Sequence, residues 1–223
     1  MRNGQHPHSK VCALVSGGLD SAVLLHRLLA GGSSVLPCYV RCGLRWEAVE
    51  LFWLRRFLNA LRSPRVQPLR VLTLPLRSVY GAHWSLAGRN VPSADSRDEA
   101  VYLPGRNVLL VSLSAIVCVQ RRISSIAIGV LRGNPFSDAS PRFFTRLSGC
   151  LAQALGRPIR VLTPLRRATK IELIRSAAAV PLGLTFSCLR PRGRRHCGRC
   201  NKCAERQRAF HEAGATDPTG YAA

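Results

Sequence analysis

Acidic residues are scarce in this chain of 223 residues, which carries 11 Asp and Glu against 33 Lys and Arg, a formal charge of +22 at pH 7. Lysine is scarcer still: Lys10, Lys170 and Lys202 are the only three, so arginine supplies almost all of the positive charge. Such a charge predicts attraction to anions, among them nucleotides, nucleic acid and acidic lipid. A coding bias toward arginine explains the same composition, because the arginines are spread along the whole chain.

Long apolar runs are missing as well. The longest apolar stretch, residues 107–119, is shorter than the roughly 20 residues that a membrane span needs, and serines interrupt it. Residues 1–10 are polar and lack the apolar centre of a secretory signal. We therefore expect a cytoplasmic protein with no membrane contact. In that reducing compartment its nine cysteines are expected to be metal ligands or buried thiols rather than disulfides.

Repeats and flexible linkers are absent too, while apolar residues make up 47% of the chain, enough to bury a core. Short apolar runs alternate with segments of helical periodicity, which is typical of a parallel sheet with helices on both faces. The predicted strands are 11–15, 35–40, 70–74, 123–130 and 159–162. The predicted helices are 21–30, 47–61, 108–119 (buried), 143–155 and 169–179. From residue 184 this alternation stops. We expect an α/β domain over residues 1–183 and a C-terminal segment, residues 184–223, packed on the same domain.

The sharpest local motif is Ser16-Gly17-Gly18-Leu19-Asp20-Ser21, between the first predicted strand and the first predicted helix. Glycine lets the backbone approach an anion closely, and a helix start offers free N–H groups and the positive end of its dipole. The hydroxyls of Ser16 and Ser21 can donate to phosphate oxygens, and Asp20 can cap the helix or help to hold Mg²⁺. The motif lacks the lysine of the common P-loop and the spacing of a dinucleotide fingerprint. We predict that this phosphate loop binds phosphate and is not an ordinary glycine turn.

Four cysteines near the C-terminus have metal-ligand spacing. Cys188, Cys197, Cys200 and Cys203 are separated by eight, two and two residues. Four thiolates form a closed tetrahedral Zn²⁺ site with a structural role. An iron–sulfur cluster also fits four cysteines, but we favour zinc, with His196 as a bystander. The other five, Cys12, Cys38, Cys42, Cys118 and Cys150, lie in or beside apolar runs, and most of them are expected to be small core residues.

Positive charge surrounds this cysteine cluster, since residues 188–210 contain eight basic residues and one acid, Glu205. The basic residues can balance the negative charge of a four-thiolate zinc site, or they can bind RNA. Aromatic residues, on which single-stranded bases stack, are almost absent there, so charge balance is the favoured interpretation.

The phosphate loop resembles the PP-loop of enzymes that cleave ATP between its α and β phosphates. Over residues 11–221 the chain resembles the 7-cyano-7-deazaguanine synthase family. The segments that carry this resemblance, besides the loop, are Leu103-Pro104-Gly105-Arg106-Asn107, Thr163-Pro164-Leu165 with Thr169-Lys170, Leu184-Thr185-Phe186-Ser187-Cys188, and the tail from Cys197 through Arg206 to Asp217-Pro218.

The resemblance implies a Rossmann-like, adenine nucleotide alpha hydrolase-like core, a homodimer and an ATP-dependent ligase. That ligase converts 7-carboxy-7-deazaguanine and ammonia to 7-cyano-7-deazaguanine (preQ0) through an adenylated intermediate, in queuosine biosynthesis. It also implies Zn²⁺ on the four cysteines and catalytic roles for Asp20, Arg106 and Lys170, the last two offsetting charge on the transferring phosphoryl group. The implied ATP-binding residues are Val15, Ser16, Gly17, Gly18, Leu19, Asp20, Ser21, Ala22, Val23 and Leu24.

Two stretches depart from the family pattern, residues 42–46 and residues 132–140, so other functions stay open. One is a ligase that uses a different carboxylate or attaches a deazaguanine to another acceptor. Another is an RNA-modifying adenylating enzyme such as a tRNA thiolase, which a closed four-thiolate site disfavours because a thiolase needs a reactive thiol or an open cluster position. The third is a non-catalytic zinc protein that binds nucleic acid, which the intact phosphate loop disfavours.

Overall fold

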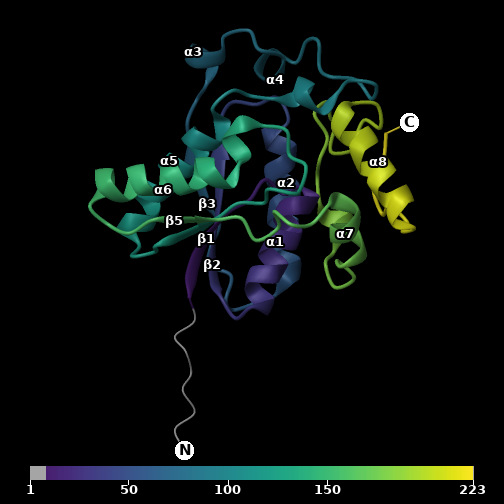
Figure 1. Ribbon diagram of the computed structural model, residues 1–223. Coiled ribbons are helices and arrows are strands. Elements are labelled where there is room, and N and C mark those ends of the chain that lie inside the picture. The colour runs from purple at the N-terminus through teal and green to yellow at the C-terminus, as the bar shows by residue number, and fades with distance from the viewer. Residues whose placement is uncertain (1–8, 223) are drawn as a thin grey trace, which may run out of the picture.

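The computed structural model describes residues 9–222 and contains one sheet of five parallel strands in the order β3-β2-β1-β4-β5. The strands are β1 (Lys10–Leu14), β2 (Ser34–Arg41), β3 (Arg70–Thr73), β4 (Ser125–Ala127) and β5 (Arg160–Leu162). Figure 1 shows helices on both sides of this sheet. The predicted α/β class is therefore confirmed. The polar start of the chain, on which the absence of a secretory signal was judged, lies mostly outside the described residues.

Eight α-helices and three short 3₁₀ helices accompany the strands in the described part of the chain. The α-helices are α1 (Leu19–Ala30), α2 (Glu47–Leu61), α3 (Arg77–Tyr80), α4 (Trp84–Ala87), α5 (Arg106–Gln120), α6 (Pro141–Leu155), α7 (Lys170–Arg175) and α8 (Asn201–Ala213). The 3₁₀ helices are η1 (Asp98–Val101), η2 (Ser137–Ala139) and η3 (Leu182–Leu184). Among residues 9–222, none of these helices combines the length and apolarity that a membrane crossing demands.

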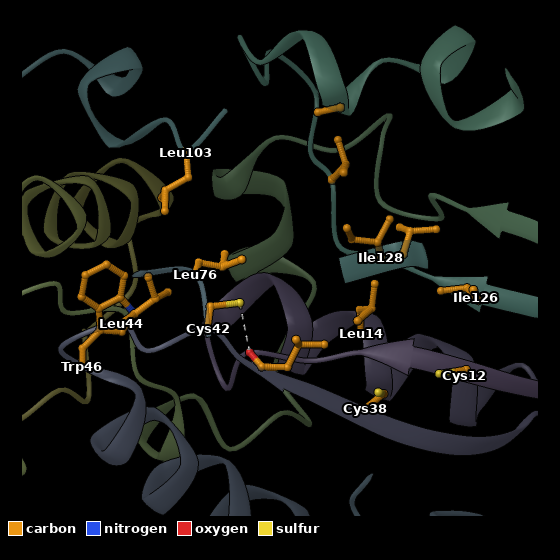
Figure 2. Close-up of a cluster of buried hydrophobic side chains, with 14 of the residues drawn as sticks. Cys12, Leu14, Cys38, Cys42, Leu44, Trp46, Leu76, Leu103, Ile126 and Ile128 are labelled. Carbon is orange, nitrogen blue, oxygen red and sulfur yellow. Dashed lines mark hydrogen bonds between the residues drawn. The ribbon is translucent and has the colours of Figure 1, made fainter. Parts of the chain in front are cut away.

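Side chains alternate along β1 and thereby divide the core into two layers. Val11, Ala13 and Val15 point toward α1 and α2, whose buried residues include Leu25 and Leu54. Cys12 and Leu14 point to the other face and pack with residues of α5. Figure 2 shows this second layer, with Cys12, Leu14, Ile126 and Ile128 along the strands and Leu103 and Trp46 at its far end. Both faces of the central strand are buried, as expected of a parallel sheet.

The strand order reverses at β1. The chain runs outward from β1 through β2 to β3, then returns to place β4 on the opposite side of β1. At such a reversal the loops after neighbouring strands separate and leave a crevice at the carboxyl ends of the strands, where ligands bind in open α/β sheets. The phosphate loop follows β1 and so lies at this point.

Three predicted elements differ from the observed ones. The predicted helix 169–179 ends at Arg175, because the chain turns after it to bury Ala177 and Val180 ahead of Pro181, which cannot continue a helix. Only residues 125–127 of the predicted strand 123–130 pair as a strand. The predicted buried helix 108–119 is a longer helix, α5, and its residues Val108 and Ile116 are 37% and 47% exposed. An apolar sequence can therefore line a partly exposed helix face.

The C-terminal segment packs against the sheet domain through several contacts. Helix α8 lies beside α7, as Figure 1 shows at the edge of the molecule. The guanidinium of Arg206 in α8 is 2% exposed and donates to Thr185 Oγ1, Leu182 O and Asp217 Oδ1. The start of α8 is bound to residues 92–96, since Asn201 N donates to Pro92 O and Asn201 Nδ2 to Ser96 O. These bonds fix α8 next to the carboxyl edge of the sheet.

Candidate active site and metal centre

The phosphate loop is a tight turn held by its own serines. Ser21 Oγ donates to Gly18 O over 2.9 Å and accepts from Ser16 N over 3.3 Å, while Gly18 N donates to Ser16 Oγ over 3.3 Å. Gly18 caps α1, and the first N–H groups of a helix have no acceptor within it. The turn therefore presents N–H groups and the positive end of the helix dipole at the carboxyl edge of the sheet, an arrangement that favours phosphate.

Gly17 is required by this turn. Its φ of +81° lies in the left-handed region, and an added Cβ would lie 3.2 Å from Leu54 Cβ and 3.3 Å from Glu50 O. The carbonyl of Gly17 accepts from Phe186 N over 2.8 Å. The loop is thus packed against α2 on one side and bonded to the start of the C-terminal segment on the other.

A cavity of about 330 Å³ opens in front of the phosphate loop. This volume falls within the range of roughly 300–1,000 Å³ that is typical of small-molecule sites. Its lining combines the loop with residues from distant parts of the chain, including Glu50, Arg106, Lys170, Lys202 and Glu205. One cavity therefore collects the predicted loop, two predicted catalytic cations and three residues that the sequence analysis did not assign to it.

Arg106 begins α5 at the edge of this cavity. Its Nε atom is buried and has no hydrogen-bond partner among the described residues. The next residue, Asn107, donates from its backbone N to Asp138 Oδ2 over 3.0 Å and from Nδ2 to Asp138 O over 2.9 Å. The divergent stretch 132–140 is thereby attached to the start of α5, where it supports the position of Arg106.

Lys170 and Lys202 share one carboxylate. Glu205 accepts from Lys170 Nζ over 2.5 Å and from Lys202 Nζ over 2.6 Å, and Lys170 Nζ lies 3.4 Å from Asp20 Oδ2. Burial alone would raise the pKa of Glu205, but the two ammonium groups outweigh it and lower the pKa to about 2. Burial raises the pKa of Asp20, and the charge of Lys170 reverses only part of that rise. Asp20 Oδ1 is buried and has no hydrogen-bond partner within residues 9–222.

Glu50 is a buried acid that also lines the cavity, and its side chain accepts from Tyr39 OH over 2.7 Å. Burial raises the pKa of Glu50 to about 7, against the opposing effects of Tyr39 and the positive charge of Arg106. Near neutral pH this carboxyl group therefore exists in both protonation states. A group of this kind can accept hydrogen bonds from a polar ligand or exchange a proton with it.

Aromatic rings form another part of the cavity wall. Trp46 stacks on Trp84 with ring centroids 5.6 Å apart, and Phe136 stacks on Tyr102 with centroids 4.9 Å apart. Trp46, Trp84 and Phe136 line the cavity. Trp46 and Phe136 come from the two stretches that depart from the family pattern, so both divergent stretches contribute flat apolar surface suited to a planar ring.

The four predicted metal ligands converge. The Sγ atoms of Cys188, Cys197, Cys200 and Cys203 all lie within 4.8 Å of one another, and all four residues are buried. The Cys197–Cys203 and Cys188–Cys200 sulfur separations are both 4.0 Å. Backbone N–H groups of Leu189, Arg190, Cys197 and Arg199 point at these sulfurs over 3.2–3.4 Å. Such donors stabilise thiolates, so the set can hold a metal ion.

His196 stays outside this set, as expected. Its Nε2 atom accepts from Ser187 N over 3.0 Å, and its ring packs against Phe186 and Tyr221. Burial, with the positive charge of Arg206, lowers the pKa of His196 to about 4. The ring is a neutral part of the packing.

Four of the other five cysteines are buried, as predicted, whereas Cys150 is exposed on α6. Cys42 follows β2 and is fully buried, and burial raises its pKa to about 11. Its thiol donates to Val40 O, the contact drawn as a dashed line in Figure 2. A neutral thiol turned toward the backbone is unsuited to nucleophilic attack.

Apart from Gly17, which shapes the turn but is not among the lining residues, the predicted residues of the phosphate site separate into two groups. Val15, Ser16, Gly18, Leu19, Asp20, Ser21, Arg106 and Lys170 line the cavity. Ala22, Val23 and Leu24 are at most 2% exposed and pack in the core behind the loop, where they position α1. Glu50, Lys202 and Glu205 were missed. Of these, only Lys202 carried a signal in the sequence, because lysine is rare in this chain and two of its three lysines, Lys170 and Lys202, line this cavity.

The loop at the strand reversal, the cavity and the sheet order define an α/β protein of the PP-loop, adenine nucleotide alpha hydrolase-like class. Among solved structures, the U34-tRNA thiolase NcsA from Methanococcus maripaludis is similar, with a TM-score of 0.53 and 14% identity over 95% of this chain and 69% of that chain. A 4-thiouridine synthetase in complex with RNA has a TM-score of 0.51 and 16% identity over 92% of this chain and 50% of that one. These likenesses concern the fold.

Sequence similarity identifies the family within this class. The family model described as "Queuosine biosynthesis protein QueC" matches residues 10–214, and the chain belongs to this family. The 7-cyano-7-deazaguanine synthase of Myxococcus xanthus (strain DK1622) is 34% identical over 228 residues, covering 95% of this chain and 97% of the relative. The 7-cyano-7-deazaguanine synthase 1 of Desulfitobacterium hafniense (strain Y51) is 32% identical over 207 residues, covering 91% of each chain. The resemblance on which the sequence analysis rested is therefore confirmed.

Proposed function

We propose that this protein is an ATP-dependent ligase that makes 7-cyano-7-deazaguanine from 7-carboxy-7-deazaguanine and ammonia, in queuosine biosynthesis. The observation that carries the proposal is the joining of the phosphate loop, Arg106 and Lys170 in one cavity. Membership of the family and the names of its relatives support the substrate.

The chemistry follows from the inertness of a carboxylate, whose oxygen is a poor leaving group. Transfer of AMP from ATP to the carboxylate releases pyrophosphate and makes AMP the leaving group. Ammonia then displaces AMP to give the amide, and a second activation removes the amide oxygen to give the nitrile. Enclosure of the reacting groups in the cavity keeps water away from the adenylated intermediate.

The residues of the chain have distinct tasks in this proposal. The phosphate loop binds the β and γ phosphates through its N–H groups and the hydroxyls of Ser16 and Ser21. Arg106 and Lys170 offset the negative charge that develops on the transferring phosphoryl group. The buried Nε atom of Arg106 has no partner within residues 9–222, which supports its role, because a donor of this kind is satisfied when an anion binds.

We include Mg²⁺ in the proposal because Asp20 offers a ligand for it. The buried Oδ1 atom of Asp20 has no partner in the described part of the chain, and a carboxylate oxygen beside phosphates is a ligand that Mg²⁺ prefers. When bound, the ion would neutralise phosphate charge. Asp20 also holds Lys170 by its other oxygen, so this side chain would place a metal ion and an ammonium group on the same phosphates.

Zn²⁺ is the ion proposed for the four cysteines. A tetrahedral site with zinc–sulfur bonds of about 2.3 Å places its sulfurs about 3.8 Å apart, close to the 4.0 Å separations found here. In an iron–sulfur cluster several metal atoms lie between the thiolates, which are then spread further apart. The short separations support one ion, with a structural role, since four thiolates leave no open position.

The remaining parts of the proposal concern organisation. The division into residues 1–183 and 184–223 is supported by the change from a sheet core to a thiolate cluster. A homodimer is supported by the exposure of Val108 and Ile116 on α5, which leaves apolar surface for a second copy. A cytoplasmic location fits reduced cysteines and a substrate that is charged by ATP.

A pyrophosphate-release assay on the metal-loaded protein tests the function. The assay compares 7-carboxy-7-deazaguanine with ammonia, bulk tRNA, and no acceptor. Release with the small acid, together with formation of the nitrile by mass spectrometry, supports the proposal. Release only with tRNA would replace it by an RNA-modifying activity, and release with none of the three would refute it.

A further inference from the structure

Lysine placement is selective in this protein. The chain uses arginine for nearly every cation, yet two of its three lysines, Lys170 and Lys202, line the cavity in front of the phosphate loop. A general bias toward arginine does not explain this pair. The compact ammonium group of lysine carries three donors and binds phosphate as a point charge.

Both lysines are prepared for an anion by Glu205. This carboxylate binds one ammonium group with each oxygen, over 2.5 Å to Lys170 and 2.6 Å to Lys202. The Lys202 side chain is 29% exposed and lies on the cavity side of α8. A hydrogen bond to Glu205 uses one of its three donors, so further donors can reach a ligand without breaking the pair.

The cysteine cluster fixes the position of Lys202. This residue lies between Cys200 and Cys203, two of the predicted metal ligands, and Cys200 is the N-cap residue of α8. The Arg206 guanidinium fixes the next turn through Asp217 and Thr185. The direction of Lys202 is therefore set by the segment that the metal organises, while its charge acts in the cavity.

We propose that Lys202 is an additional phosphate-binding residue that contacts the pyrophosphate part of ATP, and that Glu205 is a positioning residue for Lys202 and Lys170. The proposal deepens the proposed function, on which it rests, by making the C-terminal segment part of the nucleotide site. The simpler alternative is that Lys202 and Glu205 form an i,i+3 ion pair that stabilises α8 and has no role in nucleotide binding.

The test uses the full-length, metal-loaded protein at physiological salt, because an arginine-rich surface binds anions without specificity at low salt. Calorimetry measures the affinities of the Lys202→Ala variant for Mg-ATP and for AMP. Arg208→Ala is the matched control, since it removes one positive charge from the exposed side of the same helix. Metal content and thermal midpoint are measured for every variant.

We expect Lys202→Ala to weaken ATP binding by about tenfold or more, with AMP binding and metal content unchanged, and Arg208→Ala to change neither affinity. Lys202→Arg is expected to restore only part of the affinity, because the planar guanidinium presents its donors in a fixed fork and does not reproduce the compact point charge of the ammonium group. Equal ATP affinity in Lys202→Ala and the unaltered protein would overturn the proposal, and so would equal losses for ATP and AMP.

Glu205→Gln tests the positioning role. We expect kcat for pyrophosphate release to fall by about tenfold and ATP affinity to fall less than in Lys202→Ala, because the lysines keep their charge but lose their fixed placement. An unchanged kcat would contradict that role. ATP binding can be measured without an acceptor. If the unaltered protein binds ATP but does not activate the acid, the proposed function is refuted, while the effect of Lys202→Ala on ATP affinity can still be measured. An unaltered protein with no ATP affinity would refute both.

Discussion

The phosphate loop and the C-terminal segment meet at one cavity, but they are stabilised in different ways. The loop consists of six consecutive residues between β1 and α1, both buried in the sheet core. The C-terminal segment buries few large apolar side chains, chiefly Phe186, Leu189 and Phe210, and gathers instead four buried cysteines that can hold a metal ion. The position of the loop therefore depends on hydrophobic burial, whereas in our proposal the segment depends on a metal ion that can be removed.

Loss of the metal is expected to have the largest effect on stability, and to destabilise the C-terminal segment but not the phosphate loop. Cys200→Ser is expected to lower metal content and to lower the thermal midpoint by at least about 10 °C, with loss of amide protection in α8 and not in β1. Cys150→Ser is the control, because Cys150 is exposed on α6. If Cys200→Ser keeps both its stability and its α8 protection, the segment does not depend on metal.

Asp20→Ala tests the phosphate loop, the other region of this comparison. Pyrophosphate release is expected to fall by about 100-fold or more, because the Asp20 side chain holds Lys170 and, in our proposal, also binds the Mg²⁺ that neutralises the phosphates. Stability is expected to stay the same or rise, since burial raises the pKa of Asp20 and so disfavours its charged form. The exposed Asp95 provides the control variant Asp95→Ala. Retained activity in Asp20→Ala would remove Asp20 from the site.

Glu50 supplies a pH-dependent test of the wall beside the phosphate loop. Its pKa is raised from 4.5 to about 7, so the native protein binds more protons than the unfolded chain between these values. Stability therefore falls as the pH rises through this window, by about 3 kcal/mol in all. Glu50→Gln should remove this slope and become the more stable form above pH 7. Urea midpoints at pH 5 and pH 8 measure it, with the exposed Glu99→Gln as control. Parallel pH profiles would contradict the buried, ionisable Glu50.

Two glycine substitutions give the smallest effects and compare the regions directly. Gly17 and Gly193 both have positive φ, +81° and +55°, but only at Gly17 would an added Cβ meet neighbouring atoms within 4 Å. Gly193→Ala is expected to cost about 1 kcal/mol of unfolding free energy from backbone strain, and Gly17→Ala roughly 1–2 kcal/mol more. Chemical denaturation measures both. Equal losses would show that the loop is not tightly packed.

Sequence reasoning succeeded where the signal is local. The strand, the phosphate loop and the following helix are consecutive, and the cysteine spacing alone identified all four converging ligands. It did not find Glu50 or Trp84 in the cavity, because their approach depends on how α2 and α4 fold over the carboxyl edge of the sheet. It also overestimated the burial of α5, since composition does not say which face of an apolar helix the rest of the chain covers.

The hydrogen bond from Phe186 N to Gly17 O joins the residues just before the first thiolate to the turn that faces the nucleotide. Thermodynamic linkage makes such a connection reciprocal, so any gain in ATP affinity that the metal confers must return as an equal gain in metal affinity when ATP is bound. If the two sites are coupled in this way, a higher chelator concentration should be needed to remove the ion from the nucleotide-saturated protein. Nutrient supply of the metal and the energy charge of the cell would then act on the same equilibrium.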